Sequence, residues 1–489
     1  MDTPQEKKSQ HDAPSDLEHD ASGPIAGGVF NANDNEEFEV FKTTAGVNFR
    51  TVEWPRATVI FLKVIFAVGV LTIPTAMYDL GAVGGTLSVL GWGLLNTWAA
   101  VIQGDFRNNH RGCHGIADMA EVVGGPVVRE ITGALFIVAY VLLTGSGILG
   151  VSIAFNVFSG HAVCTNWFSF VAMILVVAAA SFRKMSQVSW LISKHDGRCM
   201  HLIIRSFTNT TTLQIGFLTW AGFASVFIAV FIVVVAVTQN DRPAAAPQTG
   251  PYELGFAAIA HPTFAAGMVA TCSIFVSYAG TSAFLPVISE MREPRDFRKS
   301  LYLCMAIVIA SYTSFSLVVY YYCGAWVAVP SLGSAGPTIK IIAYGVGFIG
   351  LLVSGCLYLH VGAKYVFVRI LRNSEHLQSD TWVHWGTWLG CTSGLGAIAF
   401  ILAQAIPIFN YLLSLTGSLC FAPIALSLPG WLWCHDNMAW RKGRFWQQVV
   451  FWITALMIPL GVFVCVGGTY GVVVQIKDAY ASGRIGEFT

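Results

Sequence analysis

Residues 66–78 read FAVGVLTIPTAMY and lie inside an apolar run long enough to form a membrane helix. Gly69, Thr72 and Pro74 fall within about one and a half turns of this run, and each of them weakens an α-helix. In lipid, an unpaired backbone N–H or C=O costs several kcal/mol. We therefore predict a broken helix here, in which other groups or a ligand satisfy the freed backbone.

The composition of the chain is that of a polytopic membrane protein. Of 489 residues, 55% are hydrophobic and only 11% are charged, against about 25% charged in ordinary soluble domains. A hydrocarbon core about 30 Å thick requires about 20 helical residues. We predict an all-α fold with about eleven transmembrane helices in one membrane domain, at residues 57–78, 82–103, 131–155, 164–182, 216–238, 264–288, 301–323, 338–360, 383–404, 406–428 and 447–472.

The two ends of the chain differ from this membrane domain, which we place at 56–473. Residues 1–55 hold eleven Asp/Glu against four Lys/Arg, and we predict an acidic, disordered tail. No signal peptide is expected at the start, and 474–489 form a short tail. The scattered cysteines are expected to pack as small apolar residues. The spans show no HExxH, GxSxG, paired Asp or His cluster, so we expect no enzyme, metal or cofactor.

Basic residues define the orientation, because they concentrate on the cytoplasmic side. With the N-terminus inside, 23 of the 28 Lys and Arg residues fall in cytoplasmic segments and four on the other side. Lys63 alone lies within a span. An odd number of spans then places the C-terminus outside.

The predicted sixth span repeats the opening feature, because Ser277, Gly280 and Thr281 precede Pro286 within it. We expect this helix to unwind near its middle, and Gly280→Val to block a close backbone approach. Spans one and six are five apart, which is the pairing of two inverted repeats. These are placed at about 56–238 and 264–428, with an extra helix at 447–472. Gly and Pro are frequent in membrane helices, but two breaks at matching positions indicate a transporter's binding site.

Unwound backbone at two half-helices suits a zwitterion. N–H groups at a half-helix N-terminus favour a carboxylate, while carbonyls at a C-terminus favour an ammonium or another cation. Every Asp and Glu falls in a tail, a loop or a span end. A strongly cationic substrate would call for an intramembrane carboxylate, so a neutral amino acid is favoured.

Three motifs carry a resemblance to the amino acid/auxin permease family. VGVLTIP (68–74) resembles the family's first helix, and FVSYAGTSAFLPVISEMREPRDF (275–297) resembles its sixth helix and the following loop. HGIADMAEVVGG (114–125) is similar to the loop after its second helix. The likeness covers about 45–475 and is closest to fungal permeases for neutral and aromatic amino acids. It implies a LeuT-like 5+5 inverted repeat plus one helix, uptake at the plasma membrane, and symport with a cation, expected to be a proton.

Residues 191–217 depart from the family pattern. Joining Trp190 to Leu218 would give QVSWLTWAGF, which reads as family-like sequence entering span five. We therefore predict a retained intron or a lineage-specific insert in this stretch.

Candidate site residues follow from the two breaks and the spans expected to face them. In span three, Tyr140 and Thr144 begin a small and polar stripe that either lines a pocket or allows close helix contact. In span eight, Ser354 is a candidate for holding a cation. The predicted substrate-binding residues are Gly69, Val70, Leu71, Thr72, Tyr140, Thr144, Phe275, Ser277, Tyr278, Gly280 and Thr281.

Four residues are candidates for ion coupling or for a gate: Lys63, Glu290, Ser354 and His360. The Lys63 ammonium either replaces a bound cation or extends its head to the membrane surface. His360 either relays a proton or packs. Glu290 is expected to form an inner gate or a structural ion pair.

These observations predict a secondary active transporter that imports neutral aliphatic and aromatic amino acids by alternating access. The alternative is a non-transporting amino acid receptor of the same fold. The expected partners are small neutral amino acids and the lipid bilayer, with no nucleic acid. The sequence does not indicate an oligomeric state.

Overall fold

The computed structural model describes residues 52–110, 112–113, 115–181, 212–372, 374, 376 and 381–483, without the side chains of 212–219, 286 and 289. Residues 1–51 of the predicted N-terminal tail therefore lie outside the described residues. Of the predicted insert, residues 191–211 also lie outside them, whereas residues 212–217 begin a helix.

The described chain is helical, which confirms the predicted fold class, and its only β contact is an isolated parallel bridge between Val52 and Met291. The helices of the first half are α1 (Trp54–Ile65), η2 (Val68–Thr72), α2 (Ile73–Asn109), α3 (Ile116–Ser159), α4 (Thr165–Ser181) and α7 (Thr212–Gln239). The middle holds α8 (Phe264–Val276), η3 (Ala279–Ala283), α9 (Phe284–Glu290), η4 (Pro294–Asp296), α10 (Phe297–Cys323), η5 (Gly324–Trp326) and η6 (Ser331–Ala335). The remainder holds α11 (Pro337–Leu371), α12 (Trp382–Ala405), α13 (Phe409–Leu415), η8 (Thr416–Phe421), η9 (Pro423–Ser427), α14 (Leu428–Asp436), η10 (Met438–Lys442), α15 (Phe445–Ala455) and α16 (Met457–Ala481).

Eight helices of the described part are long and apolar enough to cross a membrane, or nine if the bent pair Phe409–Phe421 and Pro423–Asp436 is one span. The predicted count of eleven is therefore not confirmed by this measure. Part of the difference between eleven and eight arises because Val68–Asn109 is counted as one helix, although parts of predicted spans one and two both lie within it. A straight helix of 42 residues would be about 63 Å long, roughly twice the hydrocarbon thickness. Gly81, with φ 77° and ψ 165°, interrupts it where the predicted first and second spans meet.

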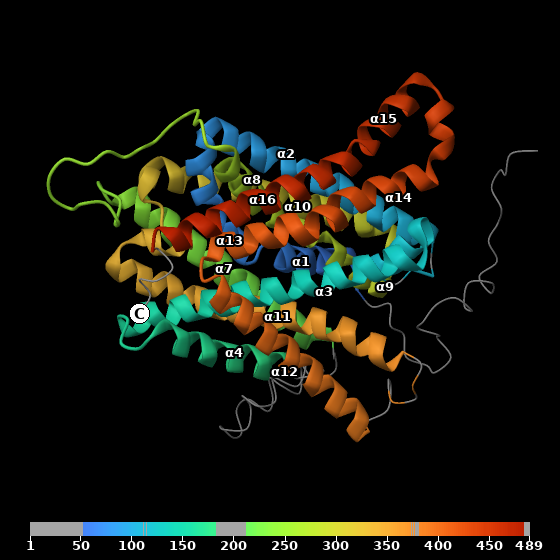
Figure 1. The fold of residues 1–489 in the computed structure, drawn as a ribbon, viewed down its shortest axis with the longest axis horizontal. Coiled ribbons are helices and arrows are strands. Elements are labelled where there is room, and N and C mark those ends of the chain that lie inside the picture. The colour runs from blue at the N-terminus through green and yellow to red at the C-terminus, as the bar shows by residue number, and fades with distance from the viewer. Residues whose placement is uncertain are drawn as a thin grey trace, which may run out of the picture. The chain divides into compact units, whose positions relative to one another are not determined.

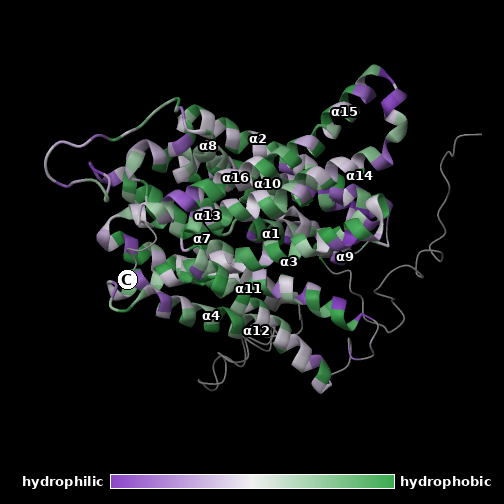
Figure 2. Ribbon diagram, viewed as in Figure 1, coloured by the Kyte–Doolittle hydropathy of each residue, from purple (hydrophilic) through white to green (hydrophobic). Residues whose placement is uncertain are grey.

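The bundle is apolar on its outer surface as well as inside. Figure 2 shows hydrophobic colour along the helices, with hydrophilic colour gathered toward their ends. Leu94 and Val466 are each 66% exposed, whereas Phe61 and Tyr312 are fully buried. An apolar exterior on long helices is suited to lipid, which confirms a multi-pass membrane protein.

Helices that are distant in sequence pack in pairs. α3, α4, α11 and α12 lie side by side (Figure 1), and α2 packs against α10. Predicted spans two, three and four thus each contact the span five places later. Predicted spans one and six also touch each other, because η2 packs against α8 and η3 packs against α1. The inverted-repeat boundaries themselves stay a prediction.

Candidate functional site

The first break separates α1 from η2. Phe66 (φ −78°, ψ 74°) and Ala67 (φ −125°, ψ −136°) leave the helical region, and the Ala67 N–H bonds back to the Ile65 carbonyl at 2.9 Å. The break thus comes about two turns before Pro74. Pro74 lies in the first turn of α2, where its missing N–H costs no helical hydrogen bond. The sequence predicted the break correctly but assigned Pro74 to it instead of to the start of the next helix.

The second break lies between α8 and α9, where the chain narrows to a 3₁₀ helix and does not unwind. The N–H groups of Ser277 and Tyr278 bond to carbonyls three residues back, at 3.2 and 3.0 Å, and the chain continues as the 3₁₀ helix η3. α9 then starts at Phe284. The expectation of an unwound middle was therefore wrong in detail. A 3₁₀ turn still interrupts the α-helical hydrogen bonds at this position.

The two breaks touch each other. A Cβ atom placed on Gly69 would lie 2.7 Å from Ser277 Oγ and 2.9 Å from Ser277 Cα, closer than real Cβ contacts occur. Beside this contact, Ser273 Oγ donates to Thr72 Oγ1 at 2.9 Å, and Thr72 Oγ1 donates to the Gly69 carbonyl at 2.8 Å. Glycine at 69 is thus required for the two breaks to meet.

Gly280 does not have the same role. A Cβ there would make ordinary contact with Val64, 3.5 Å from its nearest atom. The close approach that was expected at Gly280 occurs at Gly69.

Tyr312 on α10 joins the freed carbonyls of both breaks, and the sequence analysis did not find it. Its hydroxyl donates to the Ile65 carbonyl at 2.8 Å and lies 3.4 Å from the Ser277 carbonyl. The side chain is fully buried, and its ring packs against Phe66 and Tyr278. A tyrosine in the apolar seventh span was the only signal, and Tyr320, Tyr321 and Tyr322 follow in the same helix.

Three buried hydroxyls at the second break have no hydrogen-bond partner among the described residues: Tyr278 OH, Thr281 Oγ1 and Ser282 Oγ. A buried polar group without a partner costs about 1–3 kcal/mol. Such groups call for an explanation, and a polar ligand is one. Tyr278 and Thr281 were predicted to bind substrate, whereas Ser282 was not, and all three hydroxyls lie at the second of the paired breaks.

The remaining residues predicted to bind substrate surround this contact. All residues of η2 are buried, which places Val70 and Leu71 in the core. Phe275 is fully buried, and its ring packs against Trp92 at 5.0 Å. With Phe66, these aromatic rings give the breaks an apolar surrounding.

In span three, the stripe that begins at Tyr140 is used in large part for helix contact. Thr144 Oγ1 donates to the Tyr140 carbonyl of its own helix at 2.7 Å. A Cβ on Gly147 would lie 2.6 Å from Gly355 Cα, so α3 and α11 approach each other through two glycines. The Tyr140 side chain is buried, and its hydroxyl lies near Ser282 of the second break. Of the stripe, Tyr140 is therefore the residue that lies nearest to a break.

Lys63 lies on α1, one turn before the first break, and is only 1% exposed. Its Nζ donates to Ser354 Oγ on α11 at 2.9 Å and lies 3.5 Å from the Gly350 carbonyl. A Cβ on Gly222 of α7 would lie 2.9 Å from Lys63 Cε. The alternative of an extended side chain at the membrane surface is therefore wrong. The structure brings together the two predicted coupling residues, Lys63 and Ser354.

The other two candidates for coupling lie elsewhere. His360 Nδ1 is 3.4 Å from the Ala180 carbonyl, and its ring packs on Trp388. Glu290 ends α9, where its carbonyl accepts from the Val52 N–H at 3.1 Å. Partial desolvation raises the pKa of its carboxyl, and Lys364 opposes this rise. The ion pairs among the described residues do not include Glu290, so the structural ion pair expected for it is not found there.

Comparison with known proteins identifies the family. Residues 50–474 match the transmembrane amino acid transporter protein family, and the chain belongs to this family of amino acid permeases. A protein called transmembrane transporter from Gibberella moniliformis is 47% identical over 451 residues, which cover 92% of this chain and 90% of the relative. A transmembrane transporter from Fusarium pseudograminearum is 45% identical, covering 92% and 89%.

A more distant relative carries a narrower name. The N amino acid transport system protein of Neurospora crassa is 26% identical over 445 residues, covering 89% of this chain and 87% of the relative. The predicted resemblance is thus confirmed. The family and these relatives are transporters, so the chain is a membrane transporter and not an enzyme.

Proposed function

We propose that this transporter imports neutral aliphatic and aromatic amino acids across the plasma membrane by alternating access, with a proton as the co-transported ion. The observation that carries the proposal is the contact between the two breaks, where Gly69 meets Ser277 and Tyr312 binds the freed carbonyls. Paired broken helices of this kind form the substrate sites of many secondary transporters.

The polarity of the first break suits a zwitterion. α1 ends at Ile65, so its last carbonyls favour the ammonium group of a substrate. α2 begins at Ile73, so the N–H groups of its first turn favour the carboxylate. Residues 65–74 and 277–284 contain no charged side chain, which supports a substrate without net charge.

The side chains around the breaks support apolar and aromatic substrates. Phe66, Phe275 and Tyr278 are buried here, and rings of this kind favour contact with large apolar groups. The hydroxyls of Tyr278 and Thr281 remain to bind the polar end of the substrate.

Proton coupling is proposed for Lys63. Its amine is held between α1 and α11 through Ser354 and lies one turn from the substrate site. Intramembrane ionisable groups in such positions commonly belong to proton or ion pathways. Loss and gain of a proton there would make or break the contact between α1 and α11, which is the kind of change that alternating access needs.

Uptake into proteoliposomes tests the proposal. Labelled leucine and phenylalanine are offered with an inward proton gradient, an inward sodium gradient or no gradient. We expect accumulation above the equilibrium level only with inward protons. Accumulation driven by the sodium gradient would refute proton coupling. Binding of substrate without accumulation under any gradient would favour the alternative, a non-transporting amino acid receptor.

The orientation is a further part of the proposal. The distribution of Lys and Arg supports a cytoplasmic N-terminus and an extracellular C-terminus. Protease accessibility of terminal epitope tags in intact cells tests it, and cleavage of an N-terminal tag from outside would refute it.

A further inference from the structure

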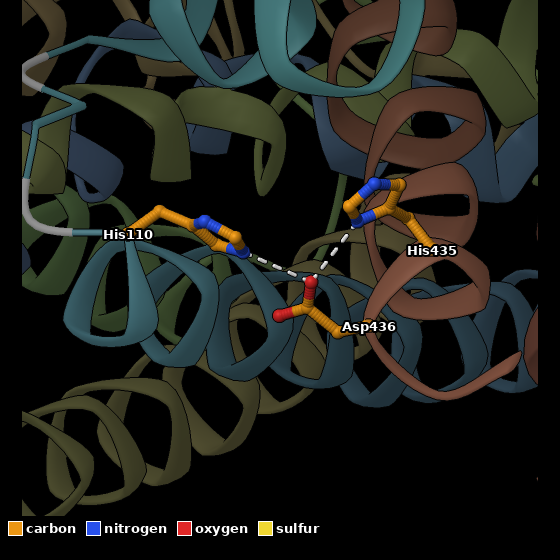
Figure 3. A group of neighbouring side chains, drawn as sticks. All are labelled: His110, His435 and Asp436. Atoms are coloured by element: carbon orange, nitrogen blue, oxygen red, sulfur yellow. Dashed lines mark hydrogen bonds and ion pairs between the residues drawn. The ribbon is translucent and has the colours of Figure 1, made fainter. Parts of the chain in front are cut away.

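Two helices far from the broken segments bring three metal-binding side chains together. His110 follows α2, and His435 and Asp436 end α14. Figure 3 shows the Asp436 carboxylate between two imidazole rings that both point toward it. One ligand atom from each side chain lies within 4.8 Å of the other two.

The spacing of these atoms matches a coordination shell. His110 Nε2 lies 3.0 Å from Asp436 Oδ1, and His435 Nδ1 lies 3.2 Å from the same oxygen. Around a tetrahedral zinc ion with bonds of about 2.0–2.1 Å, neighbouring ligand atoms are about 3.3 Å apart. Small side-chain rotations would therefore place all three atoms on one ion.

Neighbouring groups hold the ligands in place. Asn109 Nδ2 donates to the second carboxylate oxygen, Asp436 Oδ2, at 3.3 Å, which leaves Oδ1 directed at the imidazoles. The Phe106 ring packs against His110 at 4.2 Å and against His435 at 6.3 Å. Metal ligands are commonly oriented by outer groups of this kind.

We propose that His110, His435 and Asp436 form a binding site for a divalent transition-metal ion of the zinc type, which ties the end of α2 to the end of α14. Two imidazoles and one carboxylate suit zinc, whereas magnesium and calcium prefer oxygen ligands. Three protein ligands leave a fourth position for water.

The site is open to solvent. The side chains of His110 and His435 are 33% and 44% exposed. Asp436 also lines a cavity of about 470 Å³ between the ends of α2, α10 and α14. Two basic residues share that cavity, Arg295 and Arg298, and Arg298 is paired bidentately with Asp105 at 3.1 and 2.5 Å. An ion thus has a direct entry path.

The position of the site gives a bound ion a mechanical effect. α2 leads back through Gly81 to the first break. α14 ends the helix pair that is bent by 42°. An ion that joins the two helix ends would restrain these elements relative to each other, and it would stabilise the folded chain.

Zinc binding by the purified full-length protein tests the proposal. Zn²⁺ is titrated in competition with a chromophoric indicator, and the melting temperature is recorded with Zn²⁺ or with Mg²⁺. We expect one zinc ion to bind and to raise the melting temperature, while the same concentration of Mg²⁺ has no such effect. Because outer-shell changes alone cost about 10–100-fold in metal affinity, removal of one ligand should weaken this binding by at least about 10-fold.

Matched variants locate the ion. His435→Gln and His110→Gln should each weaken the binding by at least about 10-fold and reduce the thermal shift. His261→Gln, at an exposed histidine outside the cluster, should behave as wild type. Cys434→Ser, beside the site, should also leave binding unchanged. These readouts do not depend on transport activity.

Two results would overturn the proposal. The first is a wild-type protein that binds no zinc against the indicator, which would make the cluster a hydrogen-bonded surface group only. The second is zinc binding of wild-type strength in both His435→Gln and His110→Gln, which would place the ion away from these two imidazoles. His435 is the more exposed histidine, so its substitution remains informative even if His110→Gln impairs folding.

Discussion

Gly69→Ala is the substitution that tests the paired breaks most sharply. The new Cβ would lie 2.7 Å from Ser277 Oγ, 2.9 Å from Ser277 Cα and 3.0 Å from Ser277 Cβ. Ser277 Oγ can move by a change of rotamer, but Ser277 Cα is backbone. An ordinary contact begins at 3.4 Å, so the two breaks must separate by at least about 0.5 Å.

The expected cost follows from this displacement. Overpacking of one methyl group in a close-packed core costs about 1–3 kcal/mol. If this cost raises the free energy of the substrate-bound state alone, substrate binding weakens by about 5- to 150-fold, since 1.4 kcal/mol is a factor of ten in affinity. Displacement of about 1 Å in a binding site can have an effect of similar size on rate.

Binding of labelled phenylalanine to purified protein measures the effect, with uptake as a second readout. Gly91→Ala is the matched control, because a Cβ at Gly91 meets no atom within 4 Å. Adding Ser277→Gly to Gly69→Ala should restore binding only in part, since the contact with Ser277 Cα remains. Wild-type binding and uptake by a well-folded Gly69→Ala protein would refute the role of the paired breaks.

Three further predictions concern other parts of the site. Tyr312→Phe removes the hydroxyl that bridges the Ile65 and Ser277 carbonyls, although the Ile65 carbonyl keeps its bond from the Ala67 N–H, and should weaken substrate binding by about 0.5–1.5 kcal/mol, measured by equilibrium binding; unchanged binding would exclude a role for this hydroxyl. Lys63→Gln should keep substrate exchange between equal pools but abolish accumulation driven by protons, whereas Lys477→Gln, an exposed control, should keep both. Proton-driven accumulation by Lys63→Gln would rule out its amine as the proton carrier. Gly147→Ala should lower the melting temperature, because its Cβ would lie 2.6 Å from backbone, while Gly390→Ala, with no atom within 4 Å, should not.

The sequence was sufficient to locate both breaks because their causes are local. Gly69 and Pro74 in one apolar run, and Gly280 and Pro286 in another, mark weak helix whatever surrounds them. The pairing of Lys63 with Ser354 was also within reach. A lone charge in an apolar span requires a buried partner, and the resemblance implied that span eight faces span one.

The remaining features depend on tertiary contacts that no local pattern encodes. Whether a helix breaks at Ala67 or at Pro74 depends on which backbone groups find partners, and here Tyr312, 247 residues beyond Ile65, supplies one. The close approach of the two backbones was assigned to Gly280, whereas it occurs at Gly69. The sequence does not show which residue of another helix lies opposite each glycine. His110 and Asp436 are 326 residues apart, so their cluster has no motif spacing.

A cryo-electron microscopy structure with saturating phenylalanine would test the central claim most directly. The account predicts ligand density between η2 and η3, with its carboxylate toward the first turn of α2 and its polar contacts to Tyr278 and Thr281. Density in the cavity beside Asp436, with Gly69 and Ser277 still in direct contact, would contradict the assignment of the paired breaks as the substrate site.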